Sequence, residues 1–509
     1  MYRRGVPFSG RYLGQHGAVP TVLEGVERRV RAVTAPVWIL IGMMGVYVAV
    51  FGTLTWRQQS EFGTFGFDMG IYDQGIWLMS RFHDPFITVR GLEWFGHHVV
   101  LITFLFVPFY WLGAGPHFLY LVETMWLAVG AVPIWLLARD RLENPWTALP
   151  LAAAYLLYPS LEWINWWHFH PDALAITPLL FAYWLATRRR WGWFAVAAGL
   201  AVMCKEDAAL SVVMLGLLVA WKVQRRPGII TAVLAAGWFL LATRVIIPWA
   251  NGVGTFYESY FAGFGDGSGE IAYNIVRHPS RVADAATGPG RLTYYRQLLA
   301  PVALLPLGSL PVLAIAGPQL LINVISAFGY THSIRYHYSS LLVVGVMLAT
   351  VESVARYPWA EGGRRFLVGL VAATALATNV AWSPSPISVE YDSGIWAQSS
   401  PRHQVMRDAL GLVPSGAGVT AIYYLVPHLT HRKIIYEWPN PFVRPPANWG
   451  VNGENPGDPA DVDYLAIDTG LIGDEHKALY NELTAPGGEF KKLFERDQVV
   501  VAKRVRPPD

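Results

Sequence analysis

Two aspartates, Asp68 and Asp73, stand in the short segment 67–77 and could carry out acid–base chemistry. A carboxylate can deprotonate an acceptor hydroxyl group or ligate a divalent cation. Five residues correspond to about 500° on an α-helix, so the two side chains would not share a face. We expect Asp68 to be a general base that Asp73 assists. The structural alternative, an N-cap role for Asp68 on a helix running to Phe82, is compatible with catalysis.

A second group of polar residues lies in the segment 163–172, where one residue separates His168 from His170 and Asp172 follows two residues later. Side chains two residues apart in extended chain point the same way, so both histidines could face one ligand. Two histidines with an acid are a plausible half-site for a divalent cation such as Mg²⁺ or Mn²⁺. Hydrogen bonding to a sugar or an acceptor is the alternative. Trp167 could stack on a sugar, and an interfacial aromatic belt explains it equally well.

Cationic residues are the third feature. Lys205 precedes Glu206 and Asp207 between two apolar runs, where it could hold a phosphate or simply form an ion network with the two acids. Arg335 and His337 follow in the segment 329–338, and the guanidinium of Arg335 could clamp a phosphate or anchor at the membrane interface. His97 and His98 could reach the same site and assist the base.

Histidines cluster near the predicted outer connections of the chain. Of 14 histidines, nine lie in or beside these connections, at positions 83, 97, 98, 117, 168, 170, 278, 332 and 337. Ionisable groups near a membrane are costly and tend to mark functional sites. We therefore expect one site at one membrane–water boundary. The metal could be held there by Asp68, His168, His170 and Asp172, and whether a metal binds is left open.

Composition identifies the scaffold that must position these groups. The 509 residues are 53% hydrophobic and 15% charged, against about 25% charged residues in soluble proteins, and mean hydropathy is +0.32. A multi-span membrane protein requires this balance. The same composition argues against a cytosolic enzyme, a disordered scaffold and a nucleic-acid binder. The net charge of +3 also offers no basic field to DNA or RNA. A single cysteine, Cys204, excludes a disulfide framework.

Hydropathy predicts about eleven membrane spans, the first of them a signal anchor whose N-terminus is cytoplasmic. The spans are 35–55, 117–138, 147–163, 173–187, 191–204, 207–222, 228–249, 297–313, 315–328, 339–355 and 366–382. Short connections rich in arginine, among them 138–146 and 354–366, would then be cytoplasmic, as the positive-inside rule requires. The segment 98–113 is ambiguous, and we interpret it as interfacial or re-entrant.

Three domains follow from this pattern: a cytoplasmic segment 1–34, a transmembrane domain 35–382 and a soluble outer domain 383–509. The last is polar and rich in proline and glycine. It contains strand-like runs at 419–424, 433–438, 462–468 and 498–505 and a helix-like run at 476–483. The predicted class is therefore mainly α, a polytopic α-helical membrane protein with a small α/β domain on the outer face.

Four motifs together resemble a prokaryotic family of predicted membrane proteins of unknown function, which is similar to the GT-C superfamily of polyprenyl-phosphate-dependent glycosyltransferases. They are the Phe-Asp-x-Gly-x-x-Asp-Gln stretch at 67–74, Gly-His-His at 96–98, Phe-His-Pro at 169–171 and Arg-Tyr-His-Tyr at 335–338. The resemblance covers most of residues 35–470. It implies an acid in the first outer loop, best matched by Asp68 and then Asp73, and a polar tip between two spans, matched by Lys205. The second outer loop departs from the pattern, because it holds no Asp-x-Asp pair.

The resemblance implies an inverting glycosyltransferase of the cytoplasmic (inner) membrane, with its C-terminal domain outside. Its donor would be a polyprenyl-phosphate-linked sugar. Its acceptor would be a cell-envelope glycan, lipid or protein, and no nucleic acid is expected as a partner. Lys205, Arg335 and His337 would bind the donor phosphate, and Trp167, His168, His170 and Asp172 the sugar or the acceptor. The first alternative is a lipid-glycan transporter or flippase, an interpretation that internal repeats and charges deep in the spans would have favoured. The second alternative is an envelope-assembly protein.

Overall fold

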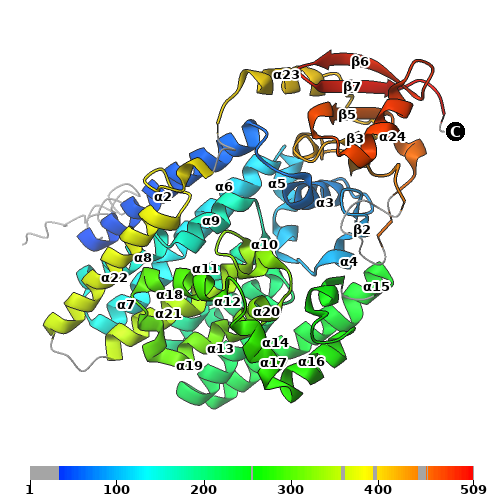
Figure 1. The fold of residues 1–509 in the computed structure, drawn as a ribbon. Coiled ribbons are helices and arrows are strands. Elements are labelled where there is room, and N and C mark those ends of the chain that lie inside the picture. Colours follow the sequence, from blue (N-terminus) through cyan, green and yellow to red (C-terminus); the bar gives the residue numbers. More distant parts are fainter. Residues whose placement is uncertain are drawn as a thin grey trace, which may run out of the picture.

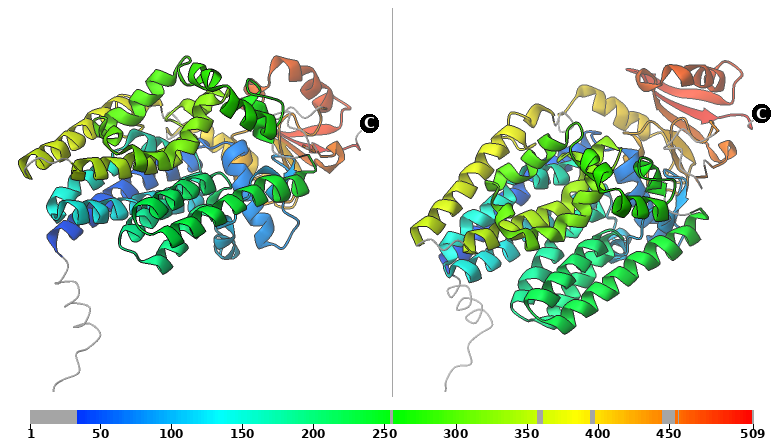
Figure 2. Two further views of the ribbon diagram at one scale, coloured as in Figure 1. Left: turned by 90° about the horizontal axis from the view of Figure 1, so that it is seen from below. Right: turned by 60° about the horizontal axis from the view of Figure 1, so that its bottom comes forward.

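The structure is a computed structural model that describes residues 34–253, 256–356, 361–393, 398–444, 454–455 and 457–507. A helical body and a C-terminal sheet region make up the fold (Figure 1). In both views of Figure 2 the long helices run along one axis, and the C-terminal sheet region lies at one end of the body. The predicted cytoplasmic segment 1–34 lies, except for Thr34, outside the described residues.

Six helical stretches in the described part of the chain are long and apolar enough to cross a membrane. They are α2 (Ala35–Ser60), α6 (Pro116–Val129) with α7 (Ala131–Leu142), α14 (Arg225–Leu241) with α15 (Ile247–Asn251), α19 (Leu310–Leu313) with α20 (Gly317–Ile325), α21 (Ser340–Arg356) and α22 (Glu361–Trp382). The chain is therefore a polytopic membrane protein, as its composition predicts. Whether all eleven predicted spans cross the bilayer stays a prediction.

Shorter helices fill the body between these stretches. They are α8 (Pro145–Leu156), α9 (Pro159–Trp167), α10 (Pro171–Leu174), α11 (Ile176–Thr187), α12 (Trp191–Cys204) and α13 (Ala208–Lys222). Proline begins several of them, because its missing N–H is not needed in the first helical turn. The Asn144 side chain caps α8 by accepting from the backbone N–H groups of Trp146 and Thr147.

Burial differs sharply between the long helices and shows which of them face lipid. The apolar windows of α2 and α14 are only 22% buried, whereas that of α21 is 89% buried. An apolar helix that buries so little of its surface in protein needs a hydrocarbon environment for the rest. The core of the body therefore lies around α21, and α2 and α14 are at its periphery.

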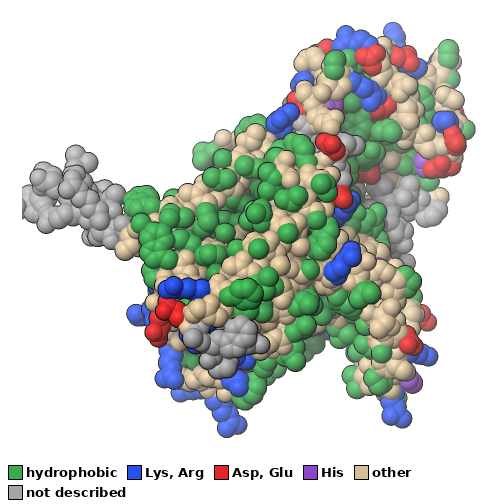
Figure 3. Space-filling model, turned by 60° about the vertical axis from the view of Figure 1, so that its left-hand side comes forward, with side chains coloured by type: hydrophobic (Ala, Val, Ile, Leu, Met, Phe, Trp, Pro, Cys, Tyr) green, Lys and Arg blue, Asp and Glu red, His purple; other side chains and the backbone are tan. Residues whose placement is uncertain are grey.

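Basic side chains mark one end of the helical body. Arg139, Arg141, Lys222 and Arg356 all lie in the last turns of their helices. Figure 3 shows one group of lysine and arginine side chains at the end opposite the C-terminal sheet region, further basic and acidic side chains on the sheet region itself, and a largely hydrophobic surface between the two ends. This distribution is the one on which the predicted orientation depends.

Two long connections leave the helical body. The first contains η1 (Gly66–Gly70, a π-helix), α3 (Ile71–Ser80), β1 (Phe86–Ile87), β2 (Leu92–Glu93), α4 (Trp94–His97), η2 (Ile102–Leu105) and α5 (Val107–Trp111). The second contains η4 (Phe256–Phe261), α16 (Ser268–Arg277), α17 (Pro279–Ala286) and α18 (Arg291–Leu299). The ambiguous segment 98–113 therefore forms two helices of four and five residues, too short to cross a bilayer.

The C-terminal sheet region contains a five-stranded sheet in the order β4-β3-β5-β7-β6. Its elements are α23 (Pro401–Leu410), β3 (Val419–Ala421), β4 (Ile435–Glu437), β5 (Tyr464–Asp468), α24 (Asp474–Thr484), β6 (Phe490–Arg496) and β7 (Val499–Arg504). Strands β4, β3 and β5 are parallel, and β5, β7 and β6 are antiparallel. The four predicted strand runs and the predicted helix are all present, while the exact domain boundary at 383 stays a prediction.

Candidate functional site

A polar cavity of about 170 Å³ lies where the first connection meets the helical body. Its charged and imidazole side chains come from five separate stretches of the sequence: Asp68, His97, His98, His170, Lys205, Glu206, Asp207 and His337. Phe239 and Ile322, from the apolar stretches of α14 and α20, line it as well. Because α14 is one of the helices that face lipid, the cavity adjoins both the polar connections and the hydrocarbon-facing surface.

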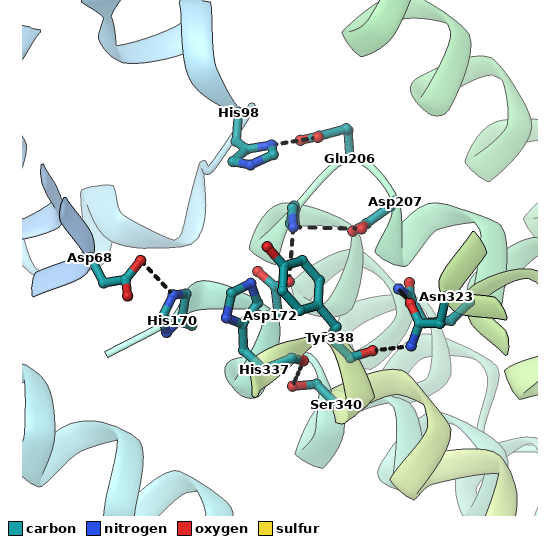
Figure 4. A network of polar contacts seen from close by, with 12 residues as sticks. Asp68, His98, His170, Asp172, Glu206, Asp207, Asn323, His337, Tyr338 and Ser340 are labelled. Atoms are coloured by element: carbon teal, nitrogen blue, oxygen red, sulfur yellow. Dashed lines mark hydrogen bonds and ion pairs between the residues drawn. The ribbon is translucent and has the colours of Figure 1, made fainter. Parts of the chain in front are cut away.

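Asp68 belongs to η1, the π-helical turn that leads into α3, and it makes no helix cap. The predicted N-cap role is therefore replaced by another contact: the carboxylate Oδ1 lies 3.3 Å from Nε2 of His170, and the two side chains face each other in Figure 4. Burial alone would raise the pKa of the Asp68 carboxyl group, but the charge and hydrogen bond of His170, with His168 and Trp167, hold it below its ordinary value. Asp68 is consequently ionised at neutral pH, and it is 19% exposed.

His170 links Asp68 to the far wall of the cavity. Its ring stacks on that of His337 with a centroid separation of 3.7 Å and an interplanar angle of 14°. His337 reaches this place through η9 (His337–Ser339), the short turn that precedes α21. Two residues 167 positions apart in the sequence thus form one surface beside the carboxylate (Figure 4).

Lys205 lies at the tip between α12 and α13 and is only 6% exposed. Its Nζ atom lies 2.9 Å from Oδ2 of Asp172 and 3.6 Å from Oδ2 of Asp207. Burial opposes the charged form, yet the carboxylates of Asp172, Asp207 and Glu206 together raise the pKa of Lys205 well above its ordinary value. The ion network predicted as the structural alternative is present, and the same lysine lines the cavity.

The third acid at this tip, Glu206, fixes the histidine pair of the first connection. Nδ1 of His98 lies 2.7 Å from Oε1 of Glu206, and the backbone N–H of Val99 donates to Oε2 at 3.1 Å. Burial opposes ionisation of Glu206, but the His98 ring and Lys205 lower the pKa of its carboxyl group. His97 packs on His98 with ring centroids 4.3 Å apart, and burial, then His98, keeps the pKa of His97 well below its ordinary value.

The cavity is electrostatically unbalanced. Its lining contains the carboxylates of Asp68, Glu206 and Asp207 and one ammonium group, that of Lys205. These four groups together carry net negative charge.

Asp73 lies outside the cavity, on the opposite side of the helical turn from Asp68. Its side chain is fully buried and accepts hydrogen bonds from the hydroxyl groups of Tyr110 (2.6 Å) and Thr430 (2.5 Å), and His431 Nε2 lies 3.2 Å away. The next residue, Gln74, donates to the backbone oxygen of Lys433. The segment 73–74 therefore attaches the first connection to the C-terminal sheet region, and we leave Asp73 out of the catalytic proposal.

We expect Asp73→Ala to loosen the C-terminal sheet region from the helical body. The change leaves two buried hydroxyl groups without their acceptor, which costs about 3 kcal/mol or more. Limited proteolysis of the purified protein should cut between the helical body and this region faster than in the wild type. Asp84→Ala is the matched control, because Asp84 is an exposed acid of the same connection. Equal cleavage rates for both variants would contradict an attaching role.

Three further predicted site residues do not line the cavity, although Trp167 hydrogen-bonds to the Asp68 carboxyl group and the charge of His168 acts on it. His168 has a φ of 139°, which turns its ring toward Tyr120, whose hydroxyl group lies 3.0 Å from Nδ1. The chain is therefore not extended there, and His168 and His170 do not share a direction. Trp167 packs edge-on against Tyr336. Arg335 is 47% exposed and pairs with Glu390 at 2.7 Å.

Asp172 does not line the cavity but contacts a residue that does. It lies beneath the lining as the partner of Lys205, and its Oδ1 atom is buried without a hydrogen-bond partner. The structure thus unites Asp68, His97, His98, His170, Lys205 and His337 in one cavity, with Asp172 next to it. Trp167, His168 and Arg335 stay predictions as ligand-binding residues, without support from the cavity. The described residues contain no group of three or more His, Cys, Asp or Glu side chains that could hold a metal ion.

Sequence reasoning missed several polar lining residues: Tyr72, Tyr260, Gln319, Thr331 and Tyr338. Tyr72 stands within the aspartate segment and Tyr338 directly follows His337, so their positions carried a signal. Gln319 is a polar residue inside an apolar run, which could also have marked it. Tyr260 and Thr331 have no such signal in the sequence.

Glu437 is a further missed carboxylate, at the end of β4. A Cβ atom on Gly66 would lie 2.8 Å from its Oε2 atom, so glycine is needed where η1 approaches β4. That oxygen is buried without a hydrogen-bond partner. Burial, and then the charge of Asp68, raise the pKa of Glu437 to about 7. The sheet region therefore places a second carboxyl group near the candidate base.

Glu437 should make stability depend on pH. A carboxyl pKa raised in the folded state means that the unfolded state releases its proton first, so stability falls as pH rises from about 4.5 to 7. We expect Glu437→Gln to match the wild type at pH 5 and to be more stable at pH 8 by at most about 3 kcal/mol. Thermal unfolding in detergent at both pH values checks this. The exposed Glu475 provides the control substitution, and a difference independent of pH would contradict the prediction.

Comparisons with known proteins agree with this architecture. The profile of a family described as "Predicted membrane protein (DUF2079)" matches residues 60–499. No curated protein matches the chain. Among solved structures, ArnT from Cupriavidus metallidurans bound to undecaprenyl phosphate is similar in fold, with a TM-score of 0.51 and 14% identity over 92% of this chain and 98% of that one. The helical body and the C-terminal sheet region thus have an ArnT-like fold.

Proposed function

The chain belongs to the DUF2079 family of predicted membrane proteins, and we propose that it is an integral-membrane glycosyltransferase of the GT-C type. It would transfer a sugar from a polyprenyl-phosphate donor to a cell-envelope acceptor. One observation carries the proposal: a single cavity next to a lipid-facing helix combines an ionised, accessible carboxylate, Asp68, with a buried ammonium group, Lys205. The solved structure of ArnT bound to undecaprenyl phosphate supports the choice of lipid.

The proposed reaction is a displacement at the anomeric carbon of the donor. Asp68 takes the proton of the acceptor hydroxyl group, and the acceptor oxygen forms a bond to that carbon. The bond between the anomeric carbon and the phosphate oxygen breaks, and its electron pair leaves with the polyprenyl phosphate. Lys205 stabilises the negative charge that develops on the leaving phosphate. In Figure 4 Asp68 lies on the opposite side of the group from Asp207, which pairs with Lys205; base and cation on opposite sides suit an inverting displacement.

The other lining residues have supporting roles in this proposal. His170, stacked on His337, holds the Asp68 carboxylate in place. Glu206 fixes His98 in the same way. Phe239 and Ile322 form the apolar wall along which the first isoprene units would leave the cavity toward lipid. No step requires a metal ion.

Orientation follows from the distribution of charge. The basic helix ends of Arg139, Arg141 and Arg356 would face the cytoplasm. The cavity and the C-terminal sheet region would then lie on the outer face of the cytoplasmic membrane, where a lipid-linked sugar meets envelope acceptors.

The direct test is binding of undecaprenyl phosphate, and of its monosaccharide conjugates, to the purified wild-type protein by native mass spectrometry. We expect one molecule of lipid phosphate per chain, and release of free undecaprenyl phosphate once a conjugate and a suitable acceptor are both present. Binding without any release across an acceptor series, together with movement of the conjugate between the leaflets of proteoliposomes, would replace the proposal by a flippase. No binding at all would also overturn it.

A further inference from the structure

A second cavity, of about 570 Å³, opens on a different side of the helical body and shares no residue with the polar cavity. Its walls come from α2, α8 and α22 and from the turn after α22, and they are almost entirely apolar. Gly42, Val46 and Phe51 of α2 line it together with Leu157 and Ile387. The contacts of α8 with both α2 and α22 make it the floor between them. We call this the α2–α22 groove.

One carboxylic acid interrupts this apolar surface. Glu162 of α9 lines the groove and is 2% exposed, and its Oε2 atom is buried without a hydrogen-bond partner. Asn379 and Ser383 hydrogen-bond to the same carboxyl group, so Oε2 is the oxygen that lacks a partner. The Ser385 hydroxyl group donates to Oδ1 of Asn379 at 2.9 Å, and Asn379 in turn donates to the backbone oxygen of Leu157. A buried carboxyl oxygen that lacks a partner is costly, so this polar end of the groove requires a hydrogen-bond donor.

The surroundings determine what can supply the donor. The groove lies on α2, whose apolar window is 22% buried, so a lipid chain is the molecule that meets this surface in a membrane. None of the described residues that line the groove is a lysine, an arginine or a histidine, so they offer a phosphate headgroup no counter-charge. The groups at the polar end are a carboxyl group, an amide and serine hydroxyls, and they suit an uncharged hydroxyl group.

We propose that the α2–α22 groove binds a neutral lipid alcohol, with its chain along α2 and its hydroxyl group donating to Glu162. The ligand is distinct from the donor in the polar cavity. Glu162 lies within α9, six residues before His168, and six helical residues correspond to about 9 Å, so one headgroup cannot occupy both places. The proposal therefore stands independently of the glycosyltransferase reaction. A free isoprenoid alcohol and a diacylglycerol share the required chemistry.

Photo-crosslinking in phosphatidylcholine nanodiscs tests the proposal, with diazirine-labelled farnesol and diazirine-labelled dioleoylglycerol as separate probes and peptide mapping by mass spectrometry. We expect labels on α2 and α22 from at least one probe, and the more effective probe identifies the source of the alcohol. Gly42→Leu should abolish this labelling, because a Cβ atom at Gly42 has no neighbour within 4 Å and the longer side chain fills the groove without a clash. Gly45→Leu on the same helix is the matched control: Gly45 is equally open but does not line the groove.

The proposed hydrogen bond from the lipid hydroxyl group to Glu162 is tested by competition of unlabelled farnesol, or of its methyl ether, which lacks the O–H donor, with the labelled probe. In the wild type the alcohol should compete about tenfold better than the ether, the difference that one hydrogen bond to a carboxyl group provides. In Glu162→Leu the two should compete equally. If that variant does not fold, the wild-type comparison still decides the matter. Equal competition by alcohol and ether in the wild type, or undiminished labelling of Gly42→Leu, would overturn the proposal.

Discussion

Replacing Asp68 by asparagine should lower the rate of sugar transfer by a factor of about 10²–10⁴ and leave the affinity for undecaprenyl phosphate close to that of the wild type. The factor is the contribution that a positioned general base makes. Asparagine has almost the same shape and still accepts a hydrogen bond from His170, which lies 3.3 Å from the carboxylate. The variant should therefore fold normally and lose only the ability to take a proton.

Two measurements on the purified variant separate this role from a structural one. Single-turnover transfer from a saturating donor reports the chemical step, and native mass spectrometry reports donor binding. Asp84→Asn is the control, since Asp84 is an exposed aspartate of the same connection and does not line the polar cavity. Transfer by Asp68→Asn at the wild-type rate would rule out Asp68 as the base. A loss of donor binding in this variant would instead place the carboxylate in the donor site.

The sequence carries enough information to predict the class of protein. It also predicts those strands of the C-terminal sheet region in which apolar and polar residues alternate or nearly all residues are apolar. β5 and β7 bury nearly every residue, and their apolar runs predict them. β6 was not predicted, because it is an edge strand whose residues 491–493 are all exposed. A strand of this kind follows from its pairing with β7 and not from its own composition.

The sequence predicts the candidate site only in part, and the reason is similar: the rest depends on contacts between distant segments. Motif spacing is enough to separate Asp68 from Asp73 on a helix, but not to say which of them faces the cavity. That depends on Tyr110 and on Thr430, which lies 357 residues away and bonds to Asp73. His168 is turned away by one unusual backbone angle. Glu437 reaches the neighbourhood of Asp68 only through the docking of β4, which no local pattern encodes.

Replacing Lys205 by methionine should produce two separable losses. The first is stability: Asp172, which is 2.9 Å from Lys205 and buried, would lose its cation, and breaking a buried ion pair from one side costs about 3–5 kcal/mol. The second is donor binding, since loss of one charge-assisted contact to phosphate lowers affinity about 10- to 100-fold. Thermal unfolding and native mass spectrometry with undecaprenyl phosphate measure the two effects.

The double variant Lys205→Met with Asp172→Leu separates these effects, because a buried ion pair replaced from both sides by apolar groups is often close to neutral in stability. We expect it to recover most of the lost stability and none of the affinity. Lys222→Met at the other end of α13 is the control, since Lys222 is exposed and packs on Trp221. If donor affinity returned together with stability, Lys205 would be only a structural partner of Asp172. Persistent loss in a stable protein is the result that a phosphate-binding lysine requires, and it would hold even if Asp68 proved not to be the base.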